Sequence, residues 1–214
     1  MHEAMTSTTT VDYQRTDGAT LRLTFAEPER ALRGGLIVLH EGHGVTDGVL
    51  LLVTSLAGEG WLTVTPHLEP DAELTQQDLL DATDITLEWL VDRGVDADLR
   101  GVVGFDLGGT AALVVASHRK LGAAVSVGGQ AVAELPRLLE IAGRVTSPWL
   151  GMYGDAGDAA GEAEVERLRD AAAAAKVATN VVRYPGANHR FDADPGAAQE
   201  AWQRTLDWFD AHLR

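Results

Sequence analysis

The chain has 214 residues, of which 45% are hydrophobic and 23% charged, as in a globular domain with a substantial core. Its 32 acidic residues oppose 17 basic ones, and the formal net charge of -15 argues against nucleic acid or an anionic membrane surface as a partner. Because cysteine is absent, a disulfide, a thiolate metal site and a cysteine nucleophile are excluded.

The N-terminal segment MHEAMTSTTT (1–10) lacks the basic and apolar regions of a signal peptide. No later apolar run approaches the roughly 20 residues of a membrane-spanning helix. We therefore expect a cytoplasmic protein in which residues 1–10 form a flexible tail and residues 11–214 form one domain.

Two segments after the tail, VDYQRT (11–16) and ATLRLTFAEP (19–28), predict a β-hairpin. Apolar residues recur at helical spacing in three segments, which predicts three helices: one that follows Thr75, one that includes Val165 and a terminal one that ends at Leu213. Six apolar runs with Gly or Pro at their ends are typical of buried strands: 34–40, 60–66, 101–105, 122–129, 147–154 and 179–185. Strands that alternate with helices predict an α/β fold, with a mostly parallel twisted sheet and helices on both faces.

The segment GFDLGG (104–109) follows a predicted strand and opens a predicted helix. Its glycines suit a tight strand-to-helix turn that presents the side chain of Asp106 at its tip. The start of the helix supplies unpaired N–H groups and favours negative charge there. The alternative is a glycine-rich turn whose aspartate only caps the helix.

His189 lies in RYPGANHRF, directly after the last predicted strand. In this architecture such a loop carries the general base, and Asp106 before His189 agrees with the chain order nucleophile, then base. The alternative is a solvated loop histidine. The next residue, Arg190, is a candidate to bind a substrate carboxylate, or else a surface arginine paired with an acid.

These segments resemble the dienelactone hydrolase family of α/β-hydrolases from about residue 11 onward. GGLIVLHEGHG resembles the family's strand and loop with its glutamate, here Glu41; GVVGFDLGGT, SPWLGMYGDAGD and RYPGANHRF resemble its nucleophile turn, acid-bearing strand end and histidine loop. The resemblance implies a small hydrolase without a cap domain or cofactor, which acts on ester or lactone carbonyls through a Cys or Ser, His and Asp triad. It implies an oxyanion hole at the backbone N–H groups of Leu107 and Gly42.

The chain departs from this family pattern at two positions. Asp106 fills the position of the cysteine, so the thiolate reaction is impossible. An ungapped reading puts Gly157 at the position of the acid, and a one-residue shift would let Asp158 orient His189. Asp155, or no acid at all, is the alternative.

A carboxylate nucleophile changes the chemistry. Attack on an acyl carbon gives an anhydride, and a carboxylate is a weaker nucleophile than a thiolate. Attack on a saturated carbon displaces a halide or opens an epoxide, and leaves an ester that His-activated water hydrolyses. Relatives that do so use tryptophans or tyrosines of a cap, whereas core packing better explains the five tryptophans of this chain.

An interpretation without turnover also remains open. Two carboxylates, Glu41 and Asp106, placed near His189 could share a proton, pair with it or bind a cation. In HEGHG, His40 and His43 lack the H-E-x-x-H spacing, and no metal is expected. The sequence thus predicts a monomeric or homodimeric hydrolase of a small ester or lactone, or else a catalytically silent binding or regulatory protein of the same fold.

Overall fold

The computed structural model describes residues 7–40, 44–68, 74–129, 137–191 and 194–214. They contain one eight-stranded sheet with strand order β1-β2-β4-β3-β5-β6-β7-β8, in which β3 to β8 are parallel and β1 and β2 join antiparallel. The strands are β1 Thr8–Gln14, β2 Thr20–Ala26, β3 Gly35–Leu39, β4 Leu62–Pro66, β5 Arg100–Phe105, β6 Ala123–Val127, β7 Trp149–Gly154 and β8 Thr179–Tyr184. The predicted α/β fold with a mostly parallel sheet is confirmed.

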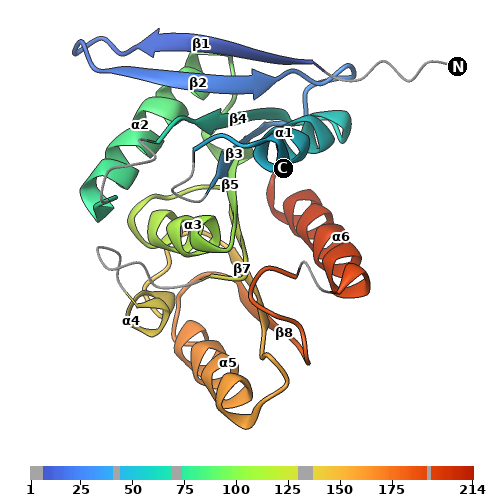
Figure 1. Ribbon diagram of the computed structural model, residues 1–214. Coiled ribbons are helices and arrows are strands. Elements are labelled where there is room, and N and C mark those ends of the chain that lie inside the picture. The colour runs from blue at the N-terminus through green and yellow to red at the C-terminus, as the bar shows by residue number, and fades with distance from the viewer. Residues whose placement is uncertain (1–6, 41–43, 69–73, 130–136, 192–193) are drawn as a thin grey trace, which may run out of the picture.

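Helices cover both faces of the sheet (Figure 1). The helices are α1 Asp47–Gly58, α2 Gln76–Asp92, α3 Leu107–His118, α4 Leu138–Ala142, α5 Ala159–Ala172 and α6 Pro195–His212, with a short 3-10 helix at Ala97–Leu99. One buried cluster joins the sheet to α1 and α6, and a second joins it to α2, α3, α4 and α5. Two separate cores therefore hold the sheet between two helical layers.

Local sequence signals explain several of these elements. Thr75 and Asp78 form the capping box that opens α2, as the sequence indicated. Trp61, Trp89 and Trp149 are at most 3% exposed, which agrees with their interpretation as core residues. None of the helices that the structure describes combines the length and apolar character needed to cross a membrane.

The N-terminal part of the chain corrects one boundary. The predicted hairpin is confirmed, since β1 and β2 pair antiparallel. However, residues 8–10, expected to belong to the flexible tail, already form the start of β1 and pair with the end of β2, with Thr8 opposite Ala26. Alternation of exposed and partly buried residues begins only at Val11, so the sequence pattern hid the first three residues of the strand.

Candidate active site

Asp106 lies at the tip of a tight turn between β5 and α3. Its φ of 52° and ψ of −116° lie in a region that is uncommon for residues other than glycine and costs conformational energy. Its amide donates to Val127 O at 2.8 Å, and its carbonyl accepts from Gly109 N at 2.9 Å. Because its side chain makes no hydrogen bond to the first turn of α3, Asp106 does not act as a side-chain cap.

Glycine is required on both sides of this tip because backbone atoms crowd it. A Cβ on Gly104 would lie 1.7 Å from Gly108 O, and a Cβ on Gly108 would lie 2.2 Å from Leu39 O. The predicted need for small residues around Asp106 is confirmed.

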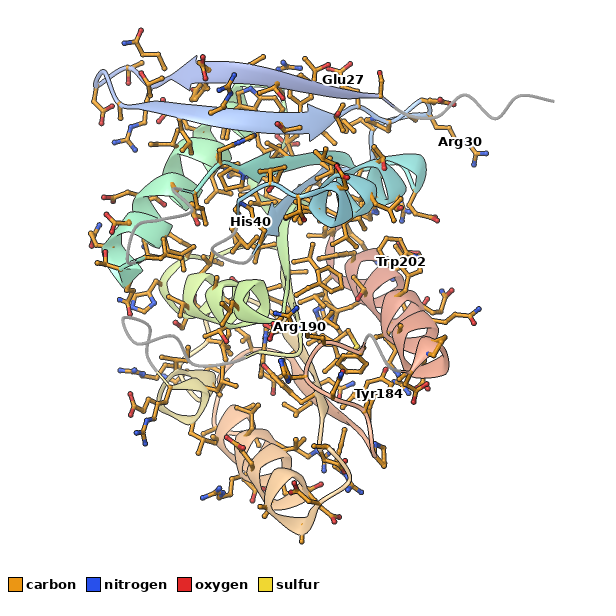
Figure 2. The ribbon with its side chains drawn as sticks, in the orientation of Figure 1. Glu27, Arg30, His40, Tyr184, Arg190 and Trp202 are labelled. Atoms are coloured by element: carbon orange, nitrogen blue, oxygen red, sulfur yellow. The ribbon has the colours of Figure 1, made fainter. Side chains whose placement is uncertain are left out.

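Two basic side chains from one loop face the Asp106 carboxylate. His189 Nε2 lies 3.8 Å from Asp106 Oδ1, an ion-pair distance too long for a hydrogen bond, and Arg190 Nε lies 3.1 Å from Oδ2. Asp106 is 4% exposed, and its Oδ1 is buried with no hydrogen-bond partner among the described residues. The structure thus brings together three predicted residues from two strand ends. In Figure 2, Arg190 lies between α3 and α6.

The loop that carries His189 is fixed against the ends of β6 and β7. Its backbone passes so close that a Cβ on Gly128 would lie 1.9 Å from His189 O, and a Cβ on Gly154 would lie 2.0 Å from Ala187 O. Phe191, at φ 60°, is buried and packs edge-on against the Tyr184 ring, which anchors the far end of the loop. The backbone is therefore held firmly, while the His189 side chain remains 44% exposed.

Asp158, expected to orient His189, has a different role. It is the N-cap of α5, and its Oδ1 accepts a hydrogen bond from Gly161 N at 2.6 Å. An aspartate at this position satisfies one of the unpaired amides of the helix start. The expected pair between Asp158 and His189 is therefore not formed, because the carboxylate turns toward its own helix.

Asp155, the alternative acid, ties two loops together. It is 3% exposed, and its Oδ1 accepts from Gly157 N at 2.8 Å and from Gly186 N at 2.7 Å. Its Oδ2 accepts from Arg183 Nη1 at 2.9 Å. The Gly186 and Gly157 amides, with Arg183, hold the pKa of the Asp155 carboxyl below its usual value. Among the described residues no hydrogen bond or ion pair joins it to His189; it stabilises the start of the histidine loop instead.

We expect Asp155→Asn to destabilise the protein more at neutral pH than in acid. Because the folded-state pKa is lowered, the ionised carboxylate stabilises the fold above the ordinary aspartate value of 3.8, and this stabilisation is lost as the pH falls through the folded-state pKa. The urea unfolding midpoints of the wild type and the variant should therefore differ by a constant amount from pH 7 down to about pH 4 and converge only as the pH falls further. Asp158→Asn, which keeps a good N-cap, is the matched control and should stay close to the wild type. A gap for Asp155→Asn that does not change with pH would contradict this role.

The backbone amide of Leu107 opens α3 directly after Asp106. An amide in the first turn has no acceptor within its own helix, so it can donate to an oxygen bound above the Asp106 side chain. Glu41 and Gly42, expected to support the same site, lie outside the described residues, as does His43. In the part of the chain that the structure describes, no group of three or more His, Asp or Glu side chains is placed to hold a metal ion.

Two cavities of about 560 Å³ each adjoin the Asp106 cluster. The first, here the α4–α5 cavity, is lined by Gly129, Arg137, Leu138, Leu139, Tyr153, Gly154, Gly161, Glu164, Val165, Arg167, Leu168 and His189. The second, here the α1 cavity, is lined by Val38, Leu39, His40, Gly44, Thr46, Gly48, Val49, Leu51, Leu52, Phe105 and Arg190. His189 lines the first cavity and Arg190 the second, and both side chains contact the Asp106 carboxylate, so each cavity is separated from it by one side chain.

Sequence reasoning missed some contributors to this site. Arg183 pairs with Asp155, which lies 28 residues earlier, and nothing in the local sequence signals that contact. Phe105 lines the α1 cavity, and its place as the last strand residue before Asp106 was an available signal. Leu138 and Leu139 belong to α4, a helix of 5 residues that was not predicted.

Known proteins share both the sequence and the fold. The profile of the dienelactone hydrolase family matches residues 69–213. A Yersinia pestis protein named "Putative carboxymethylenebutenolidase" is 30% identical over 207 residues, which cover 83% of this chain and 78% of that protein. A protein of the same name from Escherichia coli K12 is 28% identical over 204 residues, which cover 81% of this chain and 75% of that protein.

Solved structures agree with these sequence matches. A Klebsiella pneumoniae structure described as a "Putative Dienelactone Hydrolase" has a TM-score of 0.79 and 29% identity, and the match covers 95% of this chain and 99% of that one. A dienelactone hydrolase from Anabaena variabilis has the same fold, with a TM-score of 0.74 at 23% identity over 98% of this chain and 100% of that one. This chain is therefore a hydrolase of the dienelactone hydrolase family, with the single-domain α/β-hydrolase fold.

Proposed function

We propose that this hydrolase cleaves a small ester or lactone, with Asp106 as nucleophile and His189 as proton carrier. The observation that carries the proposal is the position of Asp106 at the tip of a turn with the geometry of a nucleophile elbow. Its Oδ1, which has no hydrogen-bond partner among the described residues, faces His189 Nε2 at 3.8 Å. Arg190 engages Oδ2 at 3.1 Å and so orients the carboxylate toward His189.

The reaction proceeds in two steps. Asp106 Oδ1 adds to the carbonyl carbon of the substrate, and the Leu107 amide donates to the oxygen that becomes negatively charged. The bond to the leaving oxygen breaks, that oxygen takes a proton from the His189 imidazolium, and the acyl group remains on Asp106 as an anhydride. A water molecule then gives a proton to His189 while its oxygen adds to the anhydride, which releases the acid and restores the carboxylate.

This nucleophile restricts the leaving group. A carboxylate is a weak nucleophile and is itself easily expelled, so the first addition reverses unless the other oxygen leaves readily. Phenol and enol oxygens leave far more readily than alkoxides. The proposed substrates are therefore aryl or enol esters and the corresponding lactones.

Access to Asp106 requires a local change. Since Oδ1 is buried, a substrate reaches it only when a neighbouring side chain turns aside. His189 and Arg190 are 44% and 50% exposed, so either can rotate without disturbing the core. Catalytic contacts are often long before substrate binds, which fits the 3.8 Å separation of His189 and Asp106.

We expect rates to rise steeply with the acidity of the leaving group. Phenyl acetate and the aryl lactone dihydrocoumarin should show kcat/KM values at least about 100-fold above those of ethyl acetate and δ-valerolactone. Initial rates followed by pH titration test this directly, and chloroacetate added to the panel tests attack on a saturated carbon. Equal rates for aryl and alkyl esters would contradict a carboxylate nucleophile, and turnover of chloroacetate alone would replace acyl transfer by displacement.

One observation favours a second candidate function, a binding or regulatory protein without turnover. The ion pair with Arg190 satisfies Asp106 Oδ2 without any substrate, and the burial of Oδ1 keeps the second oxygen away from one. In that case the wild type would hydrolyse nothing in the panel. Asp106→Cys would then gain activity on phenyl acetate, because a thiolate at a helix N-terminus is an activated nucleophile.

A further inference from the structure

We propose that the substrate is an open-chain ester with two apolar arms, one in each of the cavities beside Asp106. The inference rests on the proposed function, because it takes the Asp106 carboxylate as the point of cleavage. Each cavity holds about 560 Å³, within the range of sites that bind small organic molecules. A site for a single small ring would need only one of them.

Both cavities present apolar side chains at their mouths. Leu139 lines the α4–α5 cavity and is 38% exposed, and Leu51 lines the α1 cavity and is 67% exposed. They are two of the four large hydrophobic residues that are exposed in the described part of the chain. Such side chains gain free energy when an apolar ligand covers them, so an apolar group fits beside each leucine; Arg137, Glu164 and Arg167 supply the charged part of the α4–α5 lining.

The position of His189, the general acid and base of the proposed reaction, determines which arm enters which cavity. His189 lines the α4–α5 cavity and must reach the leaving oxygen, so the leaving-group arm extends into that cavity. Arg190, which contacts the other carboxylate oxygen of Asp106, lines the α1 cavity together with Phe105, so this cavity receives the acyl arm. In a small lactone one ring joins the two arms, so it cannot fill both cavities. The geometry therefore favours open-chain aryl esters over small lactones.

Three esters and three tryptophan variants test this assignment. The esters are phenyl acetate, phenyl hexanoate with a longer acyl arm, and 4-hexylphenyl acetate with a longer leaving-group arm. Leu51→Trp should lower kcat/KM about tenfold for phenyl hexanoate alone, and Leu139→Trp about tenfold for 4-hexylphenyl acetate alone, since each methylene kept out of its cavity costs about fourfold. Val91→Trp on α2 is the matched control, since Val91 is 50% exposed and lines neither cavity.

The outcomes separate this inference from the proposed function. Turnover of phenyl acetate with no effect of arm length, or with the same loss in both variants, would overturn the two-arm assignment and leave the hydrolase mechanism standing. If no ester is turned over, the binding of hexyl phenyl ketone and of 4-hexylacetophenone, measured by calorimetry, takes its place. Affinity that falls for one ketone in Leu51→Trp and for the other in Leu139→Trp would still support the two cavities. Equal affinities in all variants would overturn them.

Discussion

Replacement of Asp106 by asparagine is expected to lower kcat/KM for phenyl acetate at least about 10³-fold while the fold stays intact. The amide has nearly the same shape as the carboxylate but no nucleophilic oxygen, so the first step of the reaction is lost. The side chain contributes no cap to α3, and its partner Arg190 is 50% exposed and can be solvated. The thermal unfolding temperature of the variant, measured on the same preparation as its activity, should therefore be close to that of the wild type.

His189→Ala should fail at a different step. With 4-nitrophenyl acetate the leaving group needs no proton, so the first turnover should proceed and the hydrolysis of the anhydride should slow. Intact-protein mass spectrometry should then find one added acetyl group, which peptide mapping places on Asp106. Asp158→Asn is the control for loss of a nearby carboxylate, and its activity should stay within about twofold of the wild type because Asp158 caps α5.

An Asp106→Asn variant with the wild-type rate would show that another group attacks the substrate.

The fold followed from the sequence because two periodicities alternate along the chain. Buried parallel strands leave continuous apolar runs, and 101–105 predicted β5 to within one residue of its observed start at Arg100. Helix α1 was not predicted individually: its sequence, DGVLLLVTSLAG, is apolar almost throughout, so it shows little of the polar and apolar alternation that marks a surface helix. Helix α4 was missed because 5 residues are too few to show a period.

The site was predictable only where position along the chain determines position in space. Because parallel strands end at one edge of the sheet, the residues that follow β5 and β8 were expected to lie close together. In the structure, Asp106 Oδ1 and His189 Nε2 are 3.8 Å apart. The acid could not be chosen this way, since Asp155 and Asp158 occupy the same turn and their side-chain directions depend on its exact shape. The Asp155 carboxylate accepts a hydrogen bond from Gly186 N, 31 residues later, and so stabilises the histidine loop. No local sequence pattern indicates that contact.

Alanine at Gly104 is expected to destabilise the protein by about 3 kcal/mol or more, the largest effect on stability among single methyl additions in this turn. Its Cβ would lie 1.7 Å from Gly108 O and 2.8 Å from Gly109 N, and both of these are backbone atoms that no rotamer change can move. The start of α3 would have to shift away from β5, and Asp106 would shift with it. Activity should therefore be lost together with stability.

Two further glycines make the test quantitative. A Cβ on Gly101 would lie 3.0 Å from Leu36 Cδ2 and 3.2 Å from Ala123 O, close contacts that a small adjustment can relieve, so its alanine variant should be destabilised less than that of Gly104. Beyond its own helix backbone and chain neighbours, a Cβ on Gly58 at the end of α1 would meet no atom of the described residues within 4 Å, and alanine there should be neutral or stabilise by up to about 1 kcal/mol. Urea unfolding midpoints should fall in the order Gly58→Ala, Gly101→Ala, Gly104→Ala. If Gly104→Ala were as stable as Gly58→Ala, the turn that presents Asp106 would be less tightly closed than the structure indicates, and the strained geometry assigned to the nucleophile would have to be abandoned.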